Sequence, residues 1–515
     1  MPRLLCLLVS CCLLLAGCTQ PPISYQVVPA KLSFDKFIGA NVYEWNFQEN
    51  FEKQRVPEII FQQKAQWIDT LAWVRHYIDW DKIEAQPNQY TFNPTAFGSW
   101  NYDAIYQYCS QKNVQVLACI KGIPAWLQAS YPANQRDLEN IPAAWQAPLE
   151  NPASYTAQAK MAFQFAARYG RTKVATHLLS VHATPRWQND STNKIATGLG
   201  TVQAMECDNE RDKWWKGPQA QQTAEQYAAN LSAYYDGHLG TLGKNVGVKN
   251  ADPTMLVVMA GLAKPDTNFV HAMVNWCKKN RGYKKDGSIN LCFDVINYHY
   301  YANNTSSQQF VSGSKGVAPE YCSAAATATA FYALGKRLQL PVWLTETGYD
   351  VHQESAQGVP GKTAEQRENL RAAWLLRTCL LYYKTGIEKL ALYQLWDDGS
   401  QTATTFATTG LVTKNKASTS LQAILGMSKI LNGYRFVRQS VDKKLTVDKF
   451  IHPQKKAIWL AYLPSKDLHD ATQKLMFPSN AKVLVFDFAK QQYIFQKTVG
   501  SNTVDVGGMP VILLL

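Results

Sequence analysis

The sequence predicts an α/β fold, a closed (β/α)8 TIM barrel with a small C-terminal antiparallel β domain. Two observations predict the barrel: eight short apolar segments of strand character recur before residue 432, and helical segments separate them. A third observation predicts the second domain, because short β-type segments with turns replace this alternation beyond Gly433. A chain of 515 residues is long enough for both parts.

The apolar runs and helical patterns place each element in turn. Barrel strands are expected at residues 37–41, 73–77, 114–120, 201–207, 255–259, 293–297, 341–346 and 391–395. Helices are expected through residue 66 and at 104–112, 154–169, 224–239, 268–279, 324–338, 364–384 and 420–431, and a long loop at 179–200. Thr223 and Gln226 have the spacing of a capping box, which marks a helix start. In the β domain, strands are expected at 436–437, 444–447, 458–462, 483–488 and 504–506.

The N-terminus has the features of an export signal. Arg3 precedes an apolar run from Leu4 to Ala16, too short to span a bilayer stably. Leu15-Ala16-Gly17-Cys18 resembles the bacterial lipobox, which implies lipidation of Cys18 and a Gram-negative outer-membrane lipoprotein, on either membrane face. We therefore expect a signal peptide at 1–17, a tether at 18–34 with a strand for the β domain, the barrel at 35–432 and the β domain at 433–515.

Composition limits the function classes. The net charge of +13 favours anionic partners such as nucleic acid, an anionic envelope surface or an acidic glycan. The basic residues are spread along the chain, so we expect no nucleic-acid binding and contact with the membrane only through the lipid anchor. Seven cysteines follow Cys18 without a CxxC pair, so no zinc site is expected. Cys277 and Cys292 are the first pair to test for a disulfide.

Polar residues at the ends of predicted strands give the candidate site. In a (β/α)8 barrel the active residues lie at the C-terminal ends of the strands, so such residues share one mouth. Glu346 ends a buried strand, and Glu210 closes the run Asp208-Asn209-Glu210. Most glycosidases use a pair of carboxylates, and two strand ends of this chain would each provide one. The strand-end residues that should converge are Arg75, Glu210, His299, Tyr301, Glu346 and Trp396.

Several of these assignments have competitors. Glu44, Glu206 and Asp208 are rivals for the role of Glu210, and Arg75 or His299 alone would more often be structural. Four tryptophans are candidate sugar platforms, with simple packing as the alternative for each: Trp45, Trp126, Trp214 and Trp215.

From Ile38 to Trp396, the motifs and their order resemble those of clan A glycoside hydrolases, the group that includes families 5 and 39. The resemblance implies that Glu210 is the acid/base and Glu346 the nucleophile. It also implies that Asn209 binds the sugar 2-hydroxyl, that Arg75 and the Tyr of His299-x-Tyr301 hold the nucleophile, and that Trp396 floors the subsite. One departure affects the loop: Arg211 follows Asn209-Glu210 where many clan members have proline.

The function expected from these residues is retaining hydrolysis of β-glycosidic bonds in a polysaccharide or oligosaccharide, with no metal or organic cofactor. Trp214 and Trp215 would bind substrate with the strand-end residues, in an endo- or exo-acting site. The alternative is a non-catalytic glycan-binding lipoprotein on the same barrel. An esterase is disfavoured because the sequence has no Gly-x-Ser-x-Gly motif.

Overall fold

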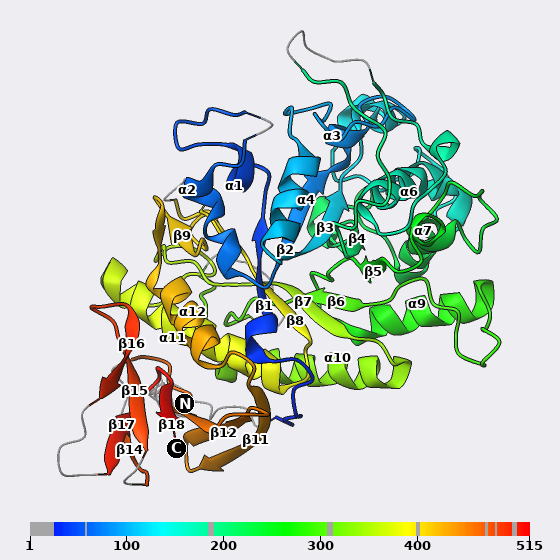
Figure 1. The fold of residues 1–515 in the computed structure, drawn as a ribbon. Helices are drawn as coiled ribbons and strands as arrows, with labels where there is room; N and C mark the ends of the chain where they lie inside the picture. Colours follow the sequence, from blue (N-terminus) through cyan, green and yellow to red (C-terminus); the bar gives the residue numbers. More distant parts are fainter. Residues whose placement is uncertain are drawn as a thin grey trace, which may run out of the picture.

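The computed structural model describes residues 25–56, 59–183, 190–305, 313–397, 402–468, 472–478, 481–496 and 502–514. Eight parallel strands form one sheet in the order β5-β4-β3-β2-β1-β8-β7-β6. Parallel bridges from Val258 to Val295 and from Leu262 to Tyr298 join the two edge strands, and the His299 amide donates to the Leu262 carbonyl at 2.9 Å. The sheet therefore curls into the predicted (β/α)8 barrel, with helices around it (Figure 1).

The barrel strands lie close to their predicted positions. They are β1 Ile38–Val42, β2 Trp73–Asp79, β3 Gln115–Lys121, β4 Ala204–Cys207, β5 Leu256–Met259, β6 Ile296–His299, β7 Val342–Thr347 and β8 Lys389–Leu392. The sixth strand begins three residues later than predicted and includes His299, while the eighth is shifted toward the N-terminus.

The long helices also agree with the sequence pattern. The helices are α1 Trp45–Gln48, α2 Gln62–Ala65, α3 Trp80–Ile83, α4 Tyr102–Gln111, α5 Ala125–Gln128, α6 Thr156–Tyr169, α7 Ala224–Asp236, α8 Val248–Ala251, α9 Thr267–Asn280, α10 Ala324–Leu338, α11 Ala364–Lys384 and α12 Thr419–Ile430. The capping box of Thr223 and Gln226 is confirmed at the start of α7, where each side chain bonds the other residue's backbone amide.

Side chains inside the barrel change from apolar to polar along the strands. One interior cluster is apolar: Trp73, Leu117, Ala204, Val258, Val295, Trp343 and Ala391. Gly39 adjoins it, and a Cβ there would lie 2.6 Å from the Trp73 ring, so only glycine fits. Because inward-facing positions recur every second residue, Arg75, Glu206 and Asn297 lie one step further along their strands. The apolar cluster supports this buried polar layer, which carries the site.

The C-terminal segment is all β, as predicted. Strands β11 Arg435–Asp442, β12 Leu445–Ile451, β13 Ile458–Tyr462, β15 Lys482–Asp487, β16 Gln492–Gln496 and β18 Val511–Leu514 form one antiparallel sheet in the order β11-β12-β13-β18-β15-β16. A second antiparallel pair in this segment is β14 Gln473–Met476 with β17 Thr503–Val506. A short pair before α12, β9 Val412–Thr413 with β10 Lys416–Ala417, belongs to the barrel part of the chain. Strands β14, β16 and β18 were not anticipated.

Contacts of α11 hold this sheet to the barrel. Lys384 forms a buried ion pair with Asp448 at 2.6 Å, and Arg377 donates to the Leu463 carbonyl at 2.8 Å. The sheet lies beside α11 and α12, below the barrel in Figure 1. Both contacts are buried, so loss of either partner would leave an unpaired polar group.

The strand expected within residues 24–34 is wrong for the described part, which begins at Tyr25. The structure assigns no strand to residues 25–33. These residues make isolated backbone hydrogen bonds, in which the Val28 amide donates to the Lys384 carbonyl and the Ala30 amide to the Phe436 carbonyl. Isolated bonds to two different elements do not make a ladder, which explains the difference.

Two further expectations concern cysteines and the membrane. Cys277 and Cys292 are neighbours, with sulfur atoms 3.5 Å apart, but both are free thiols. Cys18 and the signal peptide lie outside the described residues. Within the described ranges, no helix combines the length and apolar character needed to cross a bilayer.

Candidate active site

Arg75 on β2 is the centre of the buried polar layer. Its guanidinium binds Glu206 through Nε and Nη2 at 2.6 and 2.9 Å, and its Nη1 donates to Glu346 Oε1 at 2.7 Å. It also donates to the side-chain oxygens of Asn41 at 3.0 Å and Asn209 at 2.8 Å. The side chain is completely buried. Arg75 therefore joins strands β1, β2, β4 and β7 at one level of the barrel.

A β-bulge turns Glu346 into the barrel mouth. The register of β7 shifts between Leu344 and Thr347, so the adjacent residues Thr345 and Glu346 both make interior contacts. Tyr301 donates to Glu346 Oε2 at 2.8 Å, and Tyr77 donates a short hydrogen bond to Oε1. Glu346 is thus held by one guanidinium and two phenols.

These partners keep Glu346 ionised. Burial alone would raise the pKa of its carboxyl group, but the charges of His299 and Arg75 and the hydrogen bonds from Tyr77 and Tyr301 outweigh burial and lower the pKa. An ionised, oriented carboxylate has the properties of a nucleophile.

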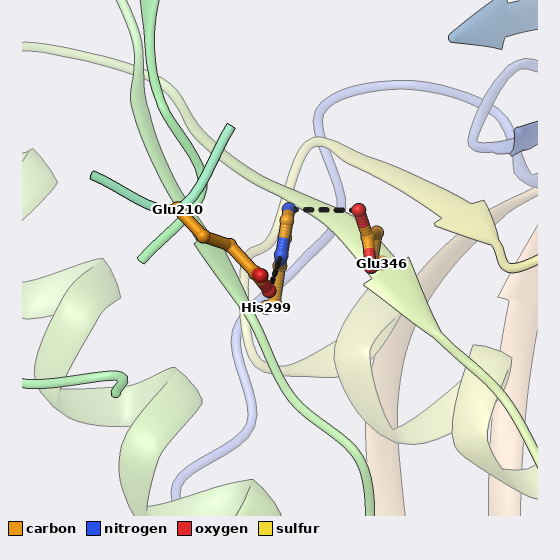
Figure 2. A group of neighbouring side chains, drawn as sticks. All are labelled: Glu210, His299 and Glu346. Atoms are coloured by element: carbon orange, nitrogen blue, oxygen red, sulfur yellow. Dashed lines mark hydrogen bonds and ion pairs between the residues drawn. The ribbon is translucent and has the colours of Figure 1, made fainter. Parts of the chain in front are cut away.

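Glu210 faces Glu346 from the loop after β4. Figure 2 shows the His299 ring between the two carboxylates, with its Nδ1 2.7 Å from Glu210 Oε1 and its Nε2 3.6 Å from Glu346 Oε1. Ligand atoms of these three residues all lie within 4.8 Å of one another. Glu210 and Glu346 therefore offer two carboxylates to one small volume at the barrel mouth.

A chain of hydrogen bonds fixes the imidazole of His299. Asn297 donates its amide to Glu206 Oε1 at 3.0 Å, so its oxygen faces Thr345 and accepts the Thr345 hydroxyl proton at 3.0 Å. Because Thr345 has one proton to donate, its oxygen accepts from His299 Nε2–H at 3.0 Å. Nδ1 of the neutral ring is then an acceptor, placed to receive a hydrogen bond from protonated Glu210.

His299 also has a perturbed acidity. Burial alone would lower the pKa of the imidazole, but the carboxylates of Glu346 and Glu210 outweigh burial and raise it. The charged form of the imidazole is therefore favoured by the two carboxylates on either side of it.

The loop that carries Glu210 is strained and tied down by Arg211. Asp208 and Glu210 have φ values of +70° and +49°, which residues other than glycine rarely adopt. Buried Arg211 binds Asp208 at 3.1 Å, Gln222 at 3.0 Å and the Ala220 carbonyl at 2.9 Å. The residue that departs from the clan pattern is thus the one that anchors the loop.

The rival carboxylates have structural partners. Glu206 is completely buried and paired with Arg75, and Asp208 is buried and paired with Arg211. Glu44 binds Lys82 at 2.9 Å and Tyr102 at 2.8 Å. Among the three, only Glu206 contacts the Arg75 network, from a position beneath the mouth.

The aromatic candidates separate into two groups. Trp45 stacks on Tyr43 at 4.3 Å, and Tyr43 stacks on Tyr77 at 5.4 Å, so a row of parallel rings leads outward from Glu346. Trp215 is 51% exposed and packs edge-on against Trp214 at 4.8 Å, just after Glu210 in the chain. The stacked row links Trp45 to the site through Tyr77, which donates to Glu346.

Two tryptophans serve packing. Trp126 packs edge-on against Trp80 at 5.8 Å and donates to the Glu84 carbonyl. Trp396 lies beyond the end of β8 with its ring 5.9 Å from Phe51, and we find no contact with either glutamate among the described residues. From the same stretch, Tyr393 reaches the site, where its hydroxyl lies 2.8 Å from the Tyr43 hydroxyl.

Sequence reasoning missed several site residues, above all Tyr77. The available signal was the strand period: Tyr77 is two residues after Arg75, and Tyr43 two after Asn41, so each pair shares a face. Asn297 and His299 are related in the same way. Tyr393 had no such signal because β8 ends before it.

Glu210, His299 and Glu346 are also the cluster that could hold a metal ion in the described part of the chain. The Arg75 guanidinium lies 2.7 Å from Glu346 Oε1, and that oxygen also accepts the Tyr77 hydroxyl. A metal ion would have to displace or repel these donors, so the donor set suits acid/base chemistry better.

Comparisons with known proteins agree with this fold. No family model and no curated protein matches the sequence. Among solved structures, a family 39 glycoside hydrolase from the gut symbiont Bacteroides cellulosilyticus WH2 is 15% identical, with 94% of this chain and 82% of that chain covered and a TM-score of 0.61.

Two more distant structures cover nearly the whole of both chains. A GH30 endoxylanase from Clostridium papyrosolvens C71 is 12% identical, with 95% and 98% covered and a TM-score of 0.51. A glucosidase from Croceicoccus marinus is 12% identical, with 96% and 98% covered and a TM-score of 0.51. The chain therefore has the (β/α)8 fold of clan A glycoside hydrolases, the group that its motifs resemble.

Proposed function

We propose that the protein is a retaining glycoside hydrolase that cleaves β-glycosidic bonds in a polysaccharide or oligosaccharide, with Glu346 as nucleophile and Glu210 as acid/base. The observation that carries the proposal is the approach of their carboxylates to within 4.8 Å, on opposite sides of His299. Retaining enzymes place this pair about 5–5.5 Å apart, since the nucleophile must itself reach the anomeric carbon.

In the first step, a Glu346 oxygen attacks the anomeric carbon while Glu210 gives its proton to the departing glycosidic oxygen. A glycosyl ester forms on Glu346, and the leaving sugar departs as an alcohol. In the second step, Glu210 takes a proton from water, whose oxygen attacks the same carbon and breaks the ester. Each step inverts the carbon once, so the configuration is retained.

The surrounding residues have separate tasks in this scheme. Arg75, Tyr77 and Tyr301 stabilise the Glu346 carboxylate before attack and after ester cleavage. Asn209 has its oxygen held by Arg75, which leaves its amide N–H groups to donate to the sugar 2-hydroxyl. His299 holds the Glu210 carboxyl group in place through the contact of its Nδ1 with Glu210 Oε1 at 2.7 Å.

The export signal and lipobox assign the enzyme to the Gram-negative envelope as a lipoprotein anchored through Cys18. This part of the proposal rests on sequence alone. Incorporation of labelled palmitate into the full chain, and its loss in Cys18→Ala, tests it.

The catalytic assignment is tested with Glu210→Ala and Glu346→Ala on a panel of aryl β-glycosides and polysaccharides. Both variants should lose at least about 10³-fold in kcat. Azide should restore turnover in Glu210→Ala and yield a β-glycosyl azide, because a small anion can attack the ester without a general base. Glu206→Gln, which alters a carboxylate beneath the mouth, is the matched control and should not respond to azide.

The competing function is glycan capture without hydrolysis. It predicts that the protein binds glycans but releases no reducing ends from any substrate. The affinity should then be the same in wild type and in both alanine variants. The two carboxylates in contact with one imidazole favour the enzyme, because a pure binding site has no need of an acid/base pair.

A further inference from the structure

Two charged residues continue the inner face of the barrel above the site. On β2 the inward positions after Arg75 are Tyr77 and Asp79, because side chains on one face recur every second residue. Their partners in the register of β3 are Cys119 and Lys121, in that order. The sulfur of Cys119 accepts from Arg75 Nη2 at 3.4 Å, so this face of β3 also points into the barrel. Asp79 and Lys121 therefore lie one step above Tyr77, at the barrel mouth.

Asp79 and Lys121, the mouth pair, form a short ion pair. Lys121 Nζ donates to Asp79 Oδ1 at 2.7 Å, and the two side chains are 24% and 25% exposed, whereas Arg75 below them is completely buried. Lys82 lies 3.1 Å from the other oxygen of Asp79 and also pairs with buried Glu44 at 2.9 Å. Two anions and two cations thus balance in this cluster, and the mouth pair is its more exposed part.

Contacts of Tyr77 place the mouth pair beside the proposed nucleophile. The Lys121 ammonium lies 5.7 Å from the centre of the Tyr77 ring. The hydroxyl of the same ring contacts Glu346 Oε1 and lies 3.0 Å from Asn209 Oδ1. One phenol ring therefore separates Lys121 from the two residues that would meet the anomeric carbon and the 2-hydroxyl of the sugar.

Both members of the mouth pair are charged and keep hydrogen-bonding capacity. Burial alone would raise the pKa of Asp79, but the ammonium groups of Lys82 and Lys121 outweigh burial and lower it. Burial alone would lower the pKa of Lys121, but Asp79 outweighs burial and raises it. An ammonium has three protons, and within the described residues that of Lys121 makes one hydrogen bond, to Asp79. A hydroxyl group suits the pair, because it donates to a carboxylate and accepts from an ammonium.

We propose that the mouth pair binds the 3-hydroxyl of the sugar whose anomeric carbon Glu346 attacks. The inference rests on the proposed function, which sets the anomeric carbon at Glu346 and the 2-hydroxyl at Asn209. The 3-hydroxyl is the next group around the sugar ring, and Tyr77 links Asn209 to the mouth pair in the same order. The substrate class is therefore a β-glycoside whose sugar has a free 3-hydroxyl, and a sugar substituted at that oxygen is excluded.

The test uses aryl β-glycosides of glucose, galactose, mannose and xylose, with the 3-deoxy and 4-deoxy analogues of the one that wild type hydrolyses fastest. Wild type should lose about tenfold or more in kcat/KM on the 3-deoxy analogue, because hydrogen bonds to charged groups are lost. Lys121→Met should lose about tenfold on the parent glycoside but less than about twofold on the 3-deoxy analogue, which lacks the group that the ammonium binds. On the 4-deoxy analogue, which keeps the 3-hydroxyl, the loss of about tenfold should remain.

Lys249→Met is the matched control. Lys249 forms a similarly short and similarly buried ion pair with Asp294, at 2.8 Å, but Asp294 precedes β6 and so lies at the end of the barrel opposite the mouth. This variant should change no rate by more than about twofold. Equal losses on the parent and the 3-deoxy analogue in Lys121→Met would show a structural role and overturn the inference. A loss that disappears on the 4-deoxy analogue instead would also overturn it.

Binding separates this inference from the proposed function. Methyl β-glycosides of the same four sugars, and their 3-deoxy analogues, are titrated by NMR into Glu346→Gln and Glu346→Gln/Lys121→Met. If the second change weakens binding of a parent glycoside about fivefold or more and leaves that of its 3-deoxy analogue unchanged, the inference is supported even without hydrolysis. Hydrolysis that does not depend on the 3-hydroxyl leaves the proposed function intact and overturns the inference. The absence of both hydrolysis and binding overturns both.

Discussion

Arg75 and Glu206 form a two-pronged ion pair, at 2.6 and 2.9 Å, beneath the barrel mouth, and both side chains are completely buried. The same guanidinium reaches upward to Glu346. The pair therefore connects the stability of the barrel to the position of the proposed nucleophile.

Replacing Arg75 with Met should leave Glu206 buried without its cation. We expect the free energy of unfolding to fall by about 3–5 kcal/mol, the usual cost of breaking a buried pair. Urea denaturation followed by circular dichroism measures it. Arg75→Met/Glu206→Met should recover part of the loss; a double variant no more stable than the single one would contradict this account of the pair.

Replacing Tyr77 with Phe removes a hydrogen bond to the Glu346 carboxylate. That hydrogen bond is one of the interactions that lower the pKa of Glu346, so the pKa should rise when it is lost. The acidic limb of kcat/KM should therefore move to higher pH. Tyr43→Phe is the control, because the Tyr43 hydroxyl meets Tyr393 instead. If the acidic limb of kcat/KM does not move in Tyr77→Phe, Tyr77 does not stabilise the Glu346 carboxylate.

The charge of His299 should stabilise the fold in acid. Its folded pKa is raised above the ordinary value of about 6.5, so its contribution is full below that pH and is lost as pH rises through the folded pKa. The stability difference between wild type and His299→Gln should therefore shrink as the pH rises above about 6.5 and through the raised folded pKa. Unfolding free energies at several pH values test it, and a constant difference would contradict it.

Arg211 should act through the Glu210 loop. Arg211→Met leaves buried Asp208 unpaired, and we expect a loss of about 3–5 kcal/mol in unfolding free energy together with a fall in kcat. Adding Asp208→Asn should restore stability more than kcat, because the strained loop still lacks its anchor. Equal recovery of both, seen in a double-mutant cycle, would argue against a positioning role.

Much of the site could be predicted because most of its residues lie at or just beyond strand ends. Glu210, His299, Tyr301 and Glu346 follow apolar runs in the sequence, and the barrel brings the ends of these runs together. Arg75 was also expected at a strand end, but it lies inside β2 Trp73–Asp79. The topology thus converts positions far apart in the chain into neighbours.

The remaining features depend on contacts that a local pattern does not carry. The bulge that turns Thr345 and Glu346 to one side arises from pairing with β6 and β8, and the left-handed backbone of Glu210 depends on the Arg211 anchor. The resemblance implied Trp396 at the end of the eighth strand, but β8 ends at Leu392, and Tyr393 is the residue of this stretch whose hydroxyl meets Tyr43. Strands β14 and β18 are short pieces whose partners lie elsewhere in the β domain, whereas β16 forms a hairpin with β15 directly before it.

The measurement that tests the central claim most directly is the configuration of the first product, followed by proton NMR during hydrolysis of a β-linked substrate. Attack by one carboxylate followed by attack by water predicts that the β-anomer forms first and then mutarotates. An initial α-anomer would contradict the account, because it would require water, and not Glu346, to attack the sugar first.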